Sequence, residues 1–121
     1  MILGHLYVVS TTLTRPPKDK LAICVCNERN LFVWINTNPR PHGVGQFKID
    51  GNSHGALNHE SHLDCSRLTT FLPAELHAAQ DRGPISPELA SAIVEWLEAE
   101  RPITLTDGHY KLLLDNLRAI A

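Results

Sequence analysis

Short apolar segments with a two-residue alternation fill the first half of the chain. Val, Ile, Leu, Phe, Tyr and Cys are concentrated in these segments, and Pro, Gly, Asn and Asp are concentrated between them. Both features are typical of β-strands joined by turns and irregular loops. The pattern predicts five strands, over residues 5–11 (HLYVVST), 21–26 (LAICVC), 31–37 (LFVWINT), 46–50 (QFKID) and 62–71 (HLDCSRLTTF).

The third of these segments is apolar on both sides. Side chains alternate between the two faces of a strand, so Val33 and Ile35 share one face while Phe32 and Trp34 share the other. A strand with two apolar faces belongs in the middle of a covered sheet. Five short strands of this kind predict a small, strongly bent antiparallel sheet or barrel.

The second half of the chain has helical spacing. Ser86 is a good N-cap, and Pro87 suits the first helical position of a helix that runs to about residue 99. Thr106 with Asp107 predicts the start of a last helix, and a short helix is expected over 74–80. The apolar stripes of the two long helices are Leu89, Ile93, Trp96 and Leu97, and Tyr110, Leu113, Leu114 and Leu117.

The size and composition of the chain suit one domain. It has 121 residues, of which 43% are hydrophobic and 20% are charged. No run of about 18 apolar residues occurs, and the N-terminus (MILGHLYVV) lacks the basic region of a signal peptide, so we expect a cytoplasmic protein. Cys24, Cys26 and Cys65 are an odd number, and the first two are too close on a strand to pair easily, which fits a reducing compartment.

The net charge of −2 conceals an asymmetry along the chain. Residues 1–50 contain six Lys or Arg and three Asp or Glu, whereas residues 51–121 contain five and ten. This distribution predicts a basic face on the first half and an acidic face on the second. Two differently solvated surfaces without a binding role are the alternative interpretation.

The basic residues of the first half gather in two loops that converge if the second and third strands are neighbours. A cationic groove of this kind suits a phosphate backbone, and uncharged donors and acceptors at a strand end can contact a base edge or a 2′-hydroxyl of single-stranded RNA. Ordinary turns are the alternative, because Asn, Thr, Pro and Gly are common in them. The candidate RNA-binding residues are Arg15, Lys18, Lys20, Asn36, Thr37, Asn38, Arg40, His42 and Lys48, together with Asp64 and Arg67 of the fifth strand.

A second group of residues has metal-ligand chemistry. His54, His59, His62 and Cys65 lie within twelve residues, and imidazole and thiolate are zinc ligands. Their spacing, H-x4-H-x2-H-x2-C, matches no short zinc motif, so we expect a histidine-rich surface loop and no metal or other cofactor. A zinc-dependent hydrolase is a third hypothesis. No G-x-S-x-G or phosphate-binding glycine loop occurs, and a strand cysteine such as Cys65 is usually inert.

The order of these segments resembles the MazF/PemK family of toxin endoribonucleases, over about residues 4–72. That family opens with a Gly-Asp-x-hydrophobic-x-Val strand, continues with a basic residue directly before an apolar strand, and closes its third strand with a polar tetrapeptide. A later stretch contains a serine or histidine, a leucine and an aspartate. The matching segments here are Gly4-His5-Leu6-Tyr7-Val8-Val9, Lys20-Leu21-Ala22-Ile23-Cys24-Val25, Ile35-Asn36-Thr37-Asn38 and Ser61-His62-Leu63-Asp64, followed by Cys65-Ser66-Arg67.

The resemblance implies an SH3-like barrel over about residues 4–72 with C-terminal helices over about 73–121 packed on it. It further implies metal-independent cleavage of single-stranded RNA by attack of the 2′-hydroxyl on the adjacent phosphate, with Lys20, Asn36 and Thr37 as the catalytic group. Implied partners are an acidic antitoxin and a second copy of the chain. Many members have arginine where Lys20 stands here. A non-catalytic barrel that binds an acidic protein segment or nucleic acid through its basic loops is the alternative function.

Overall fold

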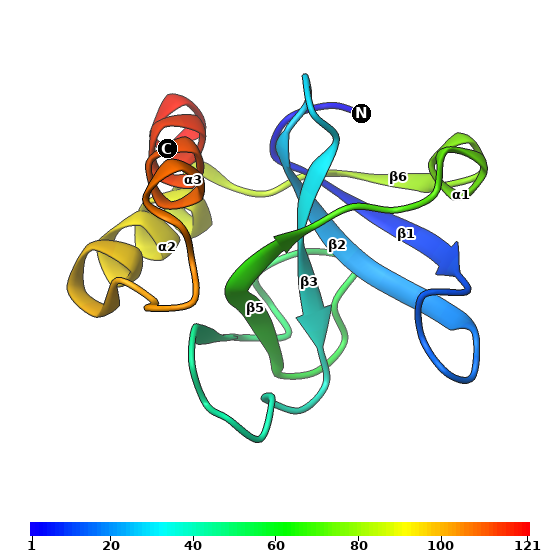
Figure 1. The fold of residues 1–121 in the computed structure, drawn as a ribbon, viewed down its shortest axis with the longest axis horizontal. Helices are drawn as coiled ribbons and strands as arrows, with labels where there is room; N and C mark the ends of the chain where they lie inside the picture. The colour runs from blue at the N-terminus through cyan, green and yellow to red at the C-terminus, as the bar shows by residue number, and fades with distance from the viewer.

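Six antiparallel strands form one twisted sheet, with three helices around it (Figure 1). The computed structural model describes residues 1–121. The order of strands across the sheet is β4-β5-β3-β2-β1-β6, so the fold belongs to the α+β class, as expected. The strands are β1 (His5–Thr11), β2 (Lys18–Cys26), β3 (Leu31–Asn36), β4 (Gln46–Ile49), β5 (Ser61–Thr69) and β6 (Gln80–Pro84).

The helices are α1 (Pro73–His77), α2 (Pro87–Glu100) and α3 (Asp107–Ile120). Both expected N-caps are confirmed, because the side chain of Ser86 accepts a hydrogen bond from the backbone N–H of Leu89, and that of Thr106 accepts one from His109. Each cap satisfies an N–H that has no partner within its helix. Helices α2 and α3 pack against each other beside the sheet, away from α1 (Figure 1).

Strand β3 lies inside the sheet with both faces covered, as its two apolar faces predicted. Val33 and Ile35 belong to the larger core, which also contains the leucines and Ile93 of the apolar stripes of α2 and α3, with Trp96 and Tyr110 packed against it. Phe32 and Trp34 belong to a smaller core of seven residues on the other face. The smaller core is Tyr7, Val9, Ala22, Cys24, Phe32, Trp34 and Phe71.

The sheet is open, so the expectation of a closed barrel is not met. Its edge strands β4 and β6 do not pair with each other. The sixth strand, β6, was not expected, because its sequence QDRGP has no apolar alternation and its first residue, Gln80, was placed in the short helix expected over 74–80, which ends at His77. Backbone hydrogen bonds to β1 hold this polar strand at the edge.

Strand β2 begins three residues earlier than expected, at Lys18. Residues Lys18 and Asp19 have no apolar pattern, and they extend the strand by pairing with Thr11 and Ser10 of β1. The longest helices have 14 residues, and none of the helices has the length and apolar character required to cross a membrane.

Candidate nucleic-acid interface

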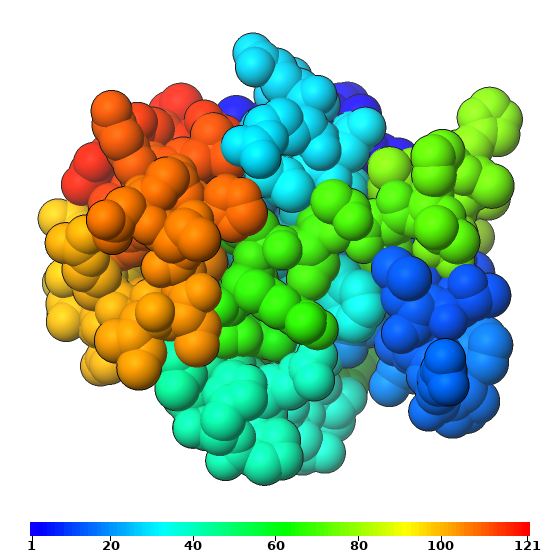
Figure 2. Space-filling model, viewed as in Figure 1, coloured from blue at the N-terminus to red at the C-terminus, as the bar shows by residue number.

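Antiparallel pairing of β2 with β3 brings the two basic loops to the same end of the sheet. Leu21 lies opposite Ile35, so the start of β2 and the end of β3 are adjacent. The β1–β2 loop and the segment that follows β3 form separate lobes on the surface, with a recess between them (Figure 2). The recess is a cavity of about 700 Å³, which we call the basic groove. It is lined by Leu13, Thr14, Arg15, Lys18, Asp19, Lys20, Leu21, Trp34, Ile35, Asn36, Thr37, Asn38, Pro39, Arg40, Pro41 and Arg67.

Positive charge predominates along the basic groove. Five of its lining side chains are cationic, and Asp19 is the one carboxylate among them. Clustered cations with low-dielectric walls concentrate a positive potential, which favours an anionic ligand. Eight of the candidate residues lie in this lining, namely Arg15, Lys18, Lys20, Asn36, Thr37, Asn38, Arg40 and Arg67.

Lys20 is the most deeply buried cation of the groove, with 7% of the residue exposed. Its Nζ donates a hydrogen bond to Oδ1 of Asn36 and lies 5.2 Å from the centroid of the Trp34 ring. Burial, together with the positive charges of Lys18 and Arg40, lowers the pKa of Lys20 to about 8. The ammonium is thus poorly solvated and has no carboxylate bonded to it, a state in which a bound anion interacts with it strongly.

Two buried hydrogen-bond donors next to Lys20 have no partner. They are Nε1 of Trp34 and Nδ2 of Asn36. Leaving a buried donor unsatisfied costs about 1–3 kcal/mol. Such groups are rare in folded proteins, and each calls for an explanation such as a ligand or a bound water molecule. The basic groove therefore combines an excess of cations over carboxylates with two buried donors that have no partner.

Asp64 lies behind the groove and fixes one of its cations. The Arg40 Nε donates to Oδ2 of Asp64 at 3.2 Å, and Asp64 also accepts hydrogen bonds from the side chains of Gln46 and Ser66. Burial raises the pKa of Asp64, but the hydrogen bonds from Ser66 and Gln46 and the charge of Arg40 outweigh it and lower the pKa below its usual value. Asp64 is 4% exposed, so it orients Arg40 instead of contacting a ligand.

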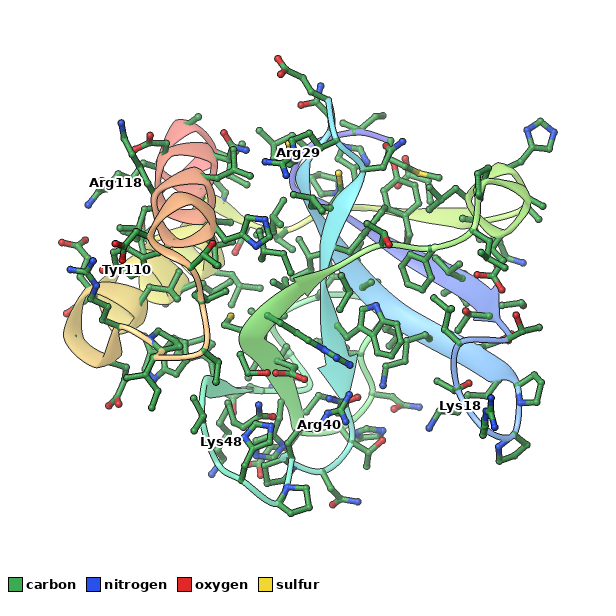
Figure 3. All side chains as sticks on the ribbon, in the orientation of Figure 1. Lys18, Arg29, Arg40, Lys48, Tyr110 and Arg118 are labelled. Atoms are coloured by element: carbon green, nitrogen blue, oxygen red, sulfur yellow. The ribbon has the colours of Figure 1, made fainter.

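His42 and Lys48 are not part of the basic groove. The Nδ1 of His42 accepts a hydrogen bond from the backbone N–H of Val44, which makes it part of a turn. The Nζ of Lys48 pairs with Glu60 at 3.2 Å, and Lys48 lies on the far side of Arg40 from Lys18 (Figure 3). The strand alternation of Phe47 and Ile49 turns Lys48 outward.

Trp34 and Gln46 belong to the site but were not among the candidate residues. Trp34 was assigned to the core because it lies on an apolar strand, and its ring does stack on Phe71, with centroids 5.6 Å apart. Its indole N–H was the available signal, because a buried tryptophan normally has a hydrogen-bond partner. Gln46 bonds both the Arg40 backbone and Asp64, and no sequence pattern indicates these two contacts.

The β1–β2 loop, which carries Arg15, is anchored by Glu75 of α1. One Glu75 oxygen accepts a hydrogen bond from Oγ1 of Thr11 at 2.9 Å, and the other accepts one from the backbone N–H of Thr12 at 2.8 Å. The same carboxylate accepts the N–H of Leu72 at the start of α1. A carboxylate with several donors holds its neighbours in one geometry, so α1 positions the loop that forms one side of the groove.

The histidines of residues 54–62 do not assemble into a metal site. No group of three or more His, Cys, Asp or Glu side chains is placed to hold a metal ion. His54 bonds the backbone oxygen of Gly83, and His62 bonds that of Thr37. Cys65 is fully buried, and this burial, with the charge of Asp64, raises the pKa of its thiol, so Cys65 is not an activated nucleophile.

Comparisons with known proteins place the chain in no family. No protein-family model, curated protein or solved structure matches it.

Proposed function

We propose that the chain is a metal-independent endoribonuclease of the MazF/PemK type, acting on single-stranded RNA in the basic groove. The observation that carries the proposal is Lys20, a poorly solvated cation among four other cations, bonded to a polar side chain that closes a strand. We also propose that the sheet is related to SH3-like barrels, that an acidic antitoxin is the protein partner, and that the chain forms a homodimer.

In the proposed reaction the 2′-oxygen of one nucleotide attacks the adjacent phosphorus, and the bond to the 5′-oxygen of the next nucleotide breaks. The 2′-hydroxyl loses a proton and the leaving 5′-oxygen gains one, so the products are a 2′,3′-cyclic phosphate and a 5′-hydroxyl, and the step consumes no water. Negative charge grows on the phosphate oxygens, and the Lys20 ammonium stabilises it. Asn36 and Thr37 contact the scissile nucleotides, while Arg15, Lys18, Arg40 and Arg67 bind flanking phosphates.

Lys20→Ala tests the proposal. Purified protein should cleave a defined single-stranded RNA in the presence of EDTA, and Lys20→Ala should lower kcat by at least about 100-fold, since one stabilising donor of a developing charge contributes that much. Gel analysis of the products gives both the rate and the end groups.

The matched control is Lys48→Ala, which removes a lysine that lies outside the basic groove and pairs with Glu60. Its cleavage rate should stay close to that of the wild type. RNA that remains intact with the wild-type protein at high concentration would end the ribonuclease proposal.

A non-catalytic binding module is the second candidate, and the excess of cations over carboxylates in the groove favours it equally. An acidic protein segment or a nucleic acid then binds without turnover. The two functions separate in one experiment, because a salt-sensitive complex with RNA that leaves the RNA intact supports the second alone.

A further inference from the structure

The two unsatisfied donors belong to the two side chains that the Lys20 ammonium touches. Nζ of Lys20 bonds Oδ1 of Asn36 and lies over the ring of Trp34, while Nδ2 of Asn36 and Nε1 of Trp34 have no partner. The orientation of the Asn36 amide follows from chemistry, since an ammonium has no acceptor and must face the amide oxygen. Its NH₂ group is thereby left as a donor.

Trp34 is not a platform for base stacking. Single-strand binding proteins commonly stack bases on exposed aromatic faces. Here the residue is 7% exposed, Phe71 stacks on the ring with an interplanar angle of 18°, and Lys20 lies at 5.2 Å from its centroid. What the ring still lacks is an acceptor for its N–H.

We propose that Trp34 Nε1, Asn36 Nδ2 and Lys20 Nζ form a three-donor subsite that binds an unprotonated oxygen of the ligand, either a phosphate oxygen or the carbonyl oxygen of a base. Three donors without an acceptor exclude hydroxyl or amino groups that must donate. The surrounding cations favour the phosphate oxygen.

Ligand binding exposes the subsite. Both unpaired donor atoms are buried in the free protein, and the Lys20 side chain, with four rotatable bonds, bonds Oδ1 of Asn36 and lies over the Trp34 ring. The ammonium keeps its hydrogen bond to Oδ1 of Asn36, so the amide oxygen stays occupied while the Lys20 side chain shifts and the two N–H groups complete the contact. The inference depends on the proposed function only in taking RNA as the ligand.

Two tryptophans make the test direct. The chain contains Trp34 and Trp96, so a ¹H–¹⁵N correlation spectrum has two indole N–H peaks, and Trp96→Phe assigns them. Trp96 is partly buried and packs on Phe47 against the larger core, outside the groove, and serves as an internal control. A 2′-O-methyl RNA oligonucleotide is the probe, because it lacks the attacking hydroxyl and cannot be cleaved.

We expect the Trp34 peak to move on saturation with the oligonucleotide while the Trp96 peak stays in place. Orthophosphate and uridine, added separately, identify the source of the oxygen: a shift with orthophosphate indicates the phosphate, and a shift with uridine indicates the base. An oligonucleotide that fails to bind, or one that binds by fluorescence anisotropy without moving the Trp34 peak, overturns the inference.

Trp34→Phe keeps an aromatic ring against Phe71 and removes the N–H. It should weaken oligonucleotide binding by about tenfold or more, as expected for a hydrogen bond to a charged group. Asn36→Asp keeps the acceptor for Lys20, replaces the NH₂ donor by an oxygen, and should weaken binding at least as much. Wild-type affinity in both folded variants contradicts the subsite.

The inference and the proposed function fail separately. If the Trp34 peak moves with the uncleavable oligonucleotide but natural RNA stays intact, the donor subsite stands and the ribonuclease does not. If natural RNA is cleaved and the Trp34 peak does not move, the ribonuclease stands and the subsite does not.

Discussion

Lys20 shows how burial changes the use of an ordinary residue. A lysine on the surface keeps its charge far above neutral pH, but here burial and two neighbouring cations lower its pKa to about 8. The ammonium remains the main form at neutral pH. Its charge is lost as the pH rises through about 8, and any function that needs the cation is lost with it.

The pH dependence of cleavage is therefore a prediction about this one residue. Wild-type kcat/KM should fall about tenfold per pH unit above about pH 8, because the neutral amine cannot stabilise the phosphate charge. Lys20→Arg keeps a charge throughout this range, since the guanidinium titrates above about pH 12. Its activity, whatever its absolute level, should stay flat between about pH 7 and 9.

Initial rates on a short RNA at several pH values measure both profiles, with the background of protein-free RNA subtracted. Coincident profiles for the wild type and Lys20→Arg would assign the pH dependence to another group.

The loop between β3 and β4 depends on one close backbone contact with β5. Gly45 has φ of +69°, and its carbonyl accepts the N–H of Cys65 on β5 at 2.8 Å. A Cβ at this position would lie 2.6 Å from the backbone nitrogen of Ser66. A side chain at this position would therefore push the loop away from the backbone of β5.

Gly45→Ala should lower the free energy of unfolding by about 2–3 kcal/mol, because it combines a positive φ with overpacking against a backbone. Gly43→Ala is the matched control. Gly43 has nearly the same φ, +71°, but open space around it, so its variant should lose only about 1 kcal/mol.

Urea denaturation of both variants measures the difference. Equal losses would show that the contact with Ser66 relaxes without cost. If the loop also positions Arg40, Gly45→Ala should weaken RNA binding more than Gly43→Ala does.

At the scale of the whole molecule, charge separation lets a chain of net charge −2 present a cationic groove. Arg15, Lys18 and Lys20 come from one loop and strand, Arg40 from another loop and Arg67 from β5. The acidic excess lies in the second half of the sequence. Binding of a polyanion should therefore be electrostatic despite the negative total.

The salt dependence of RNA binding measures how many of these cations act together. Each phosphate contact on a single strand contributes about −0.7 to the slope of log association constant against log salt concentration. If all five cations contact phosphates, this slope should be about −3 to −4. Arg67→Ala should reduce the slope by about 0.7. Arg118→Ala, on the outer face of α3, should leave it unchanged.

Fluorescence anisotropy at several salt concentrations supplies the slopes. A wild-type slope near zero would show that the groove does not bind the phosphate backbone. If Arg118→Ala changed the slope as much as Arg67→Ala, the electrostatic potential of the whole protein, and not the groove, would account for binding.

Local sequence determined the elements whose signals are local. The alternation of Leu31 to Ile35 fixed a doubly covered strand, and Ser86 with Pro87 fixed the start of α2, because strand faces and helix caps depend on residues a few positions apart. The grouping of Lys20 with Asn36 was also predictable. It required only that two consecutive strands pair, which hairpin-connected strands usually do.

Tertiary structure alone decided the rest. Strand β6 forms because β1 offers a free edge, not because QDRGP favours a strand, and it leaves the sheet open. Asp64 orients Arg40 although the two residues are 24 positions apart in the sequence. Lys48 lies outside the basic groove because strand alternation turns it toward Glu60. The unsatisfied N–H groups of Trp34 and Asn36 arise from burial, a property of the packed molecule that no residue carries in its sequence.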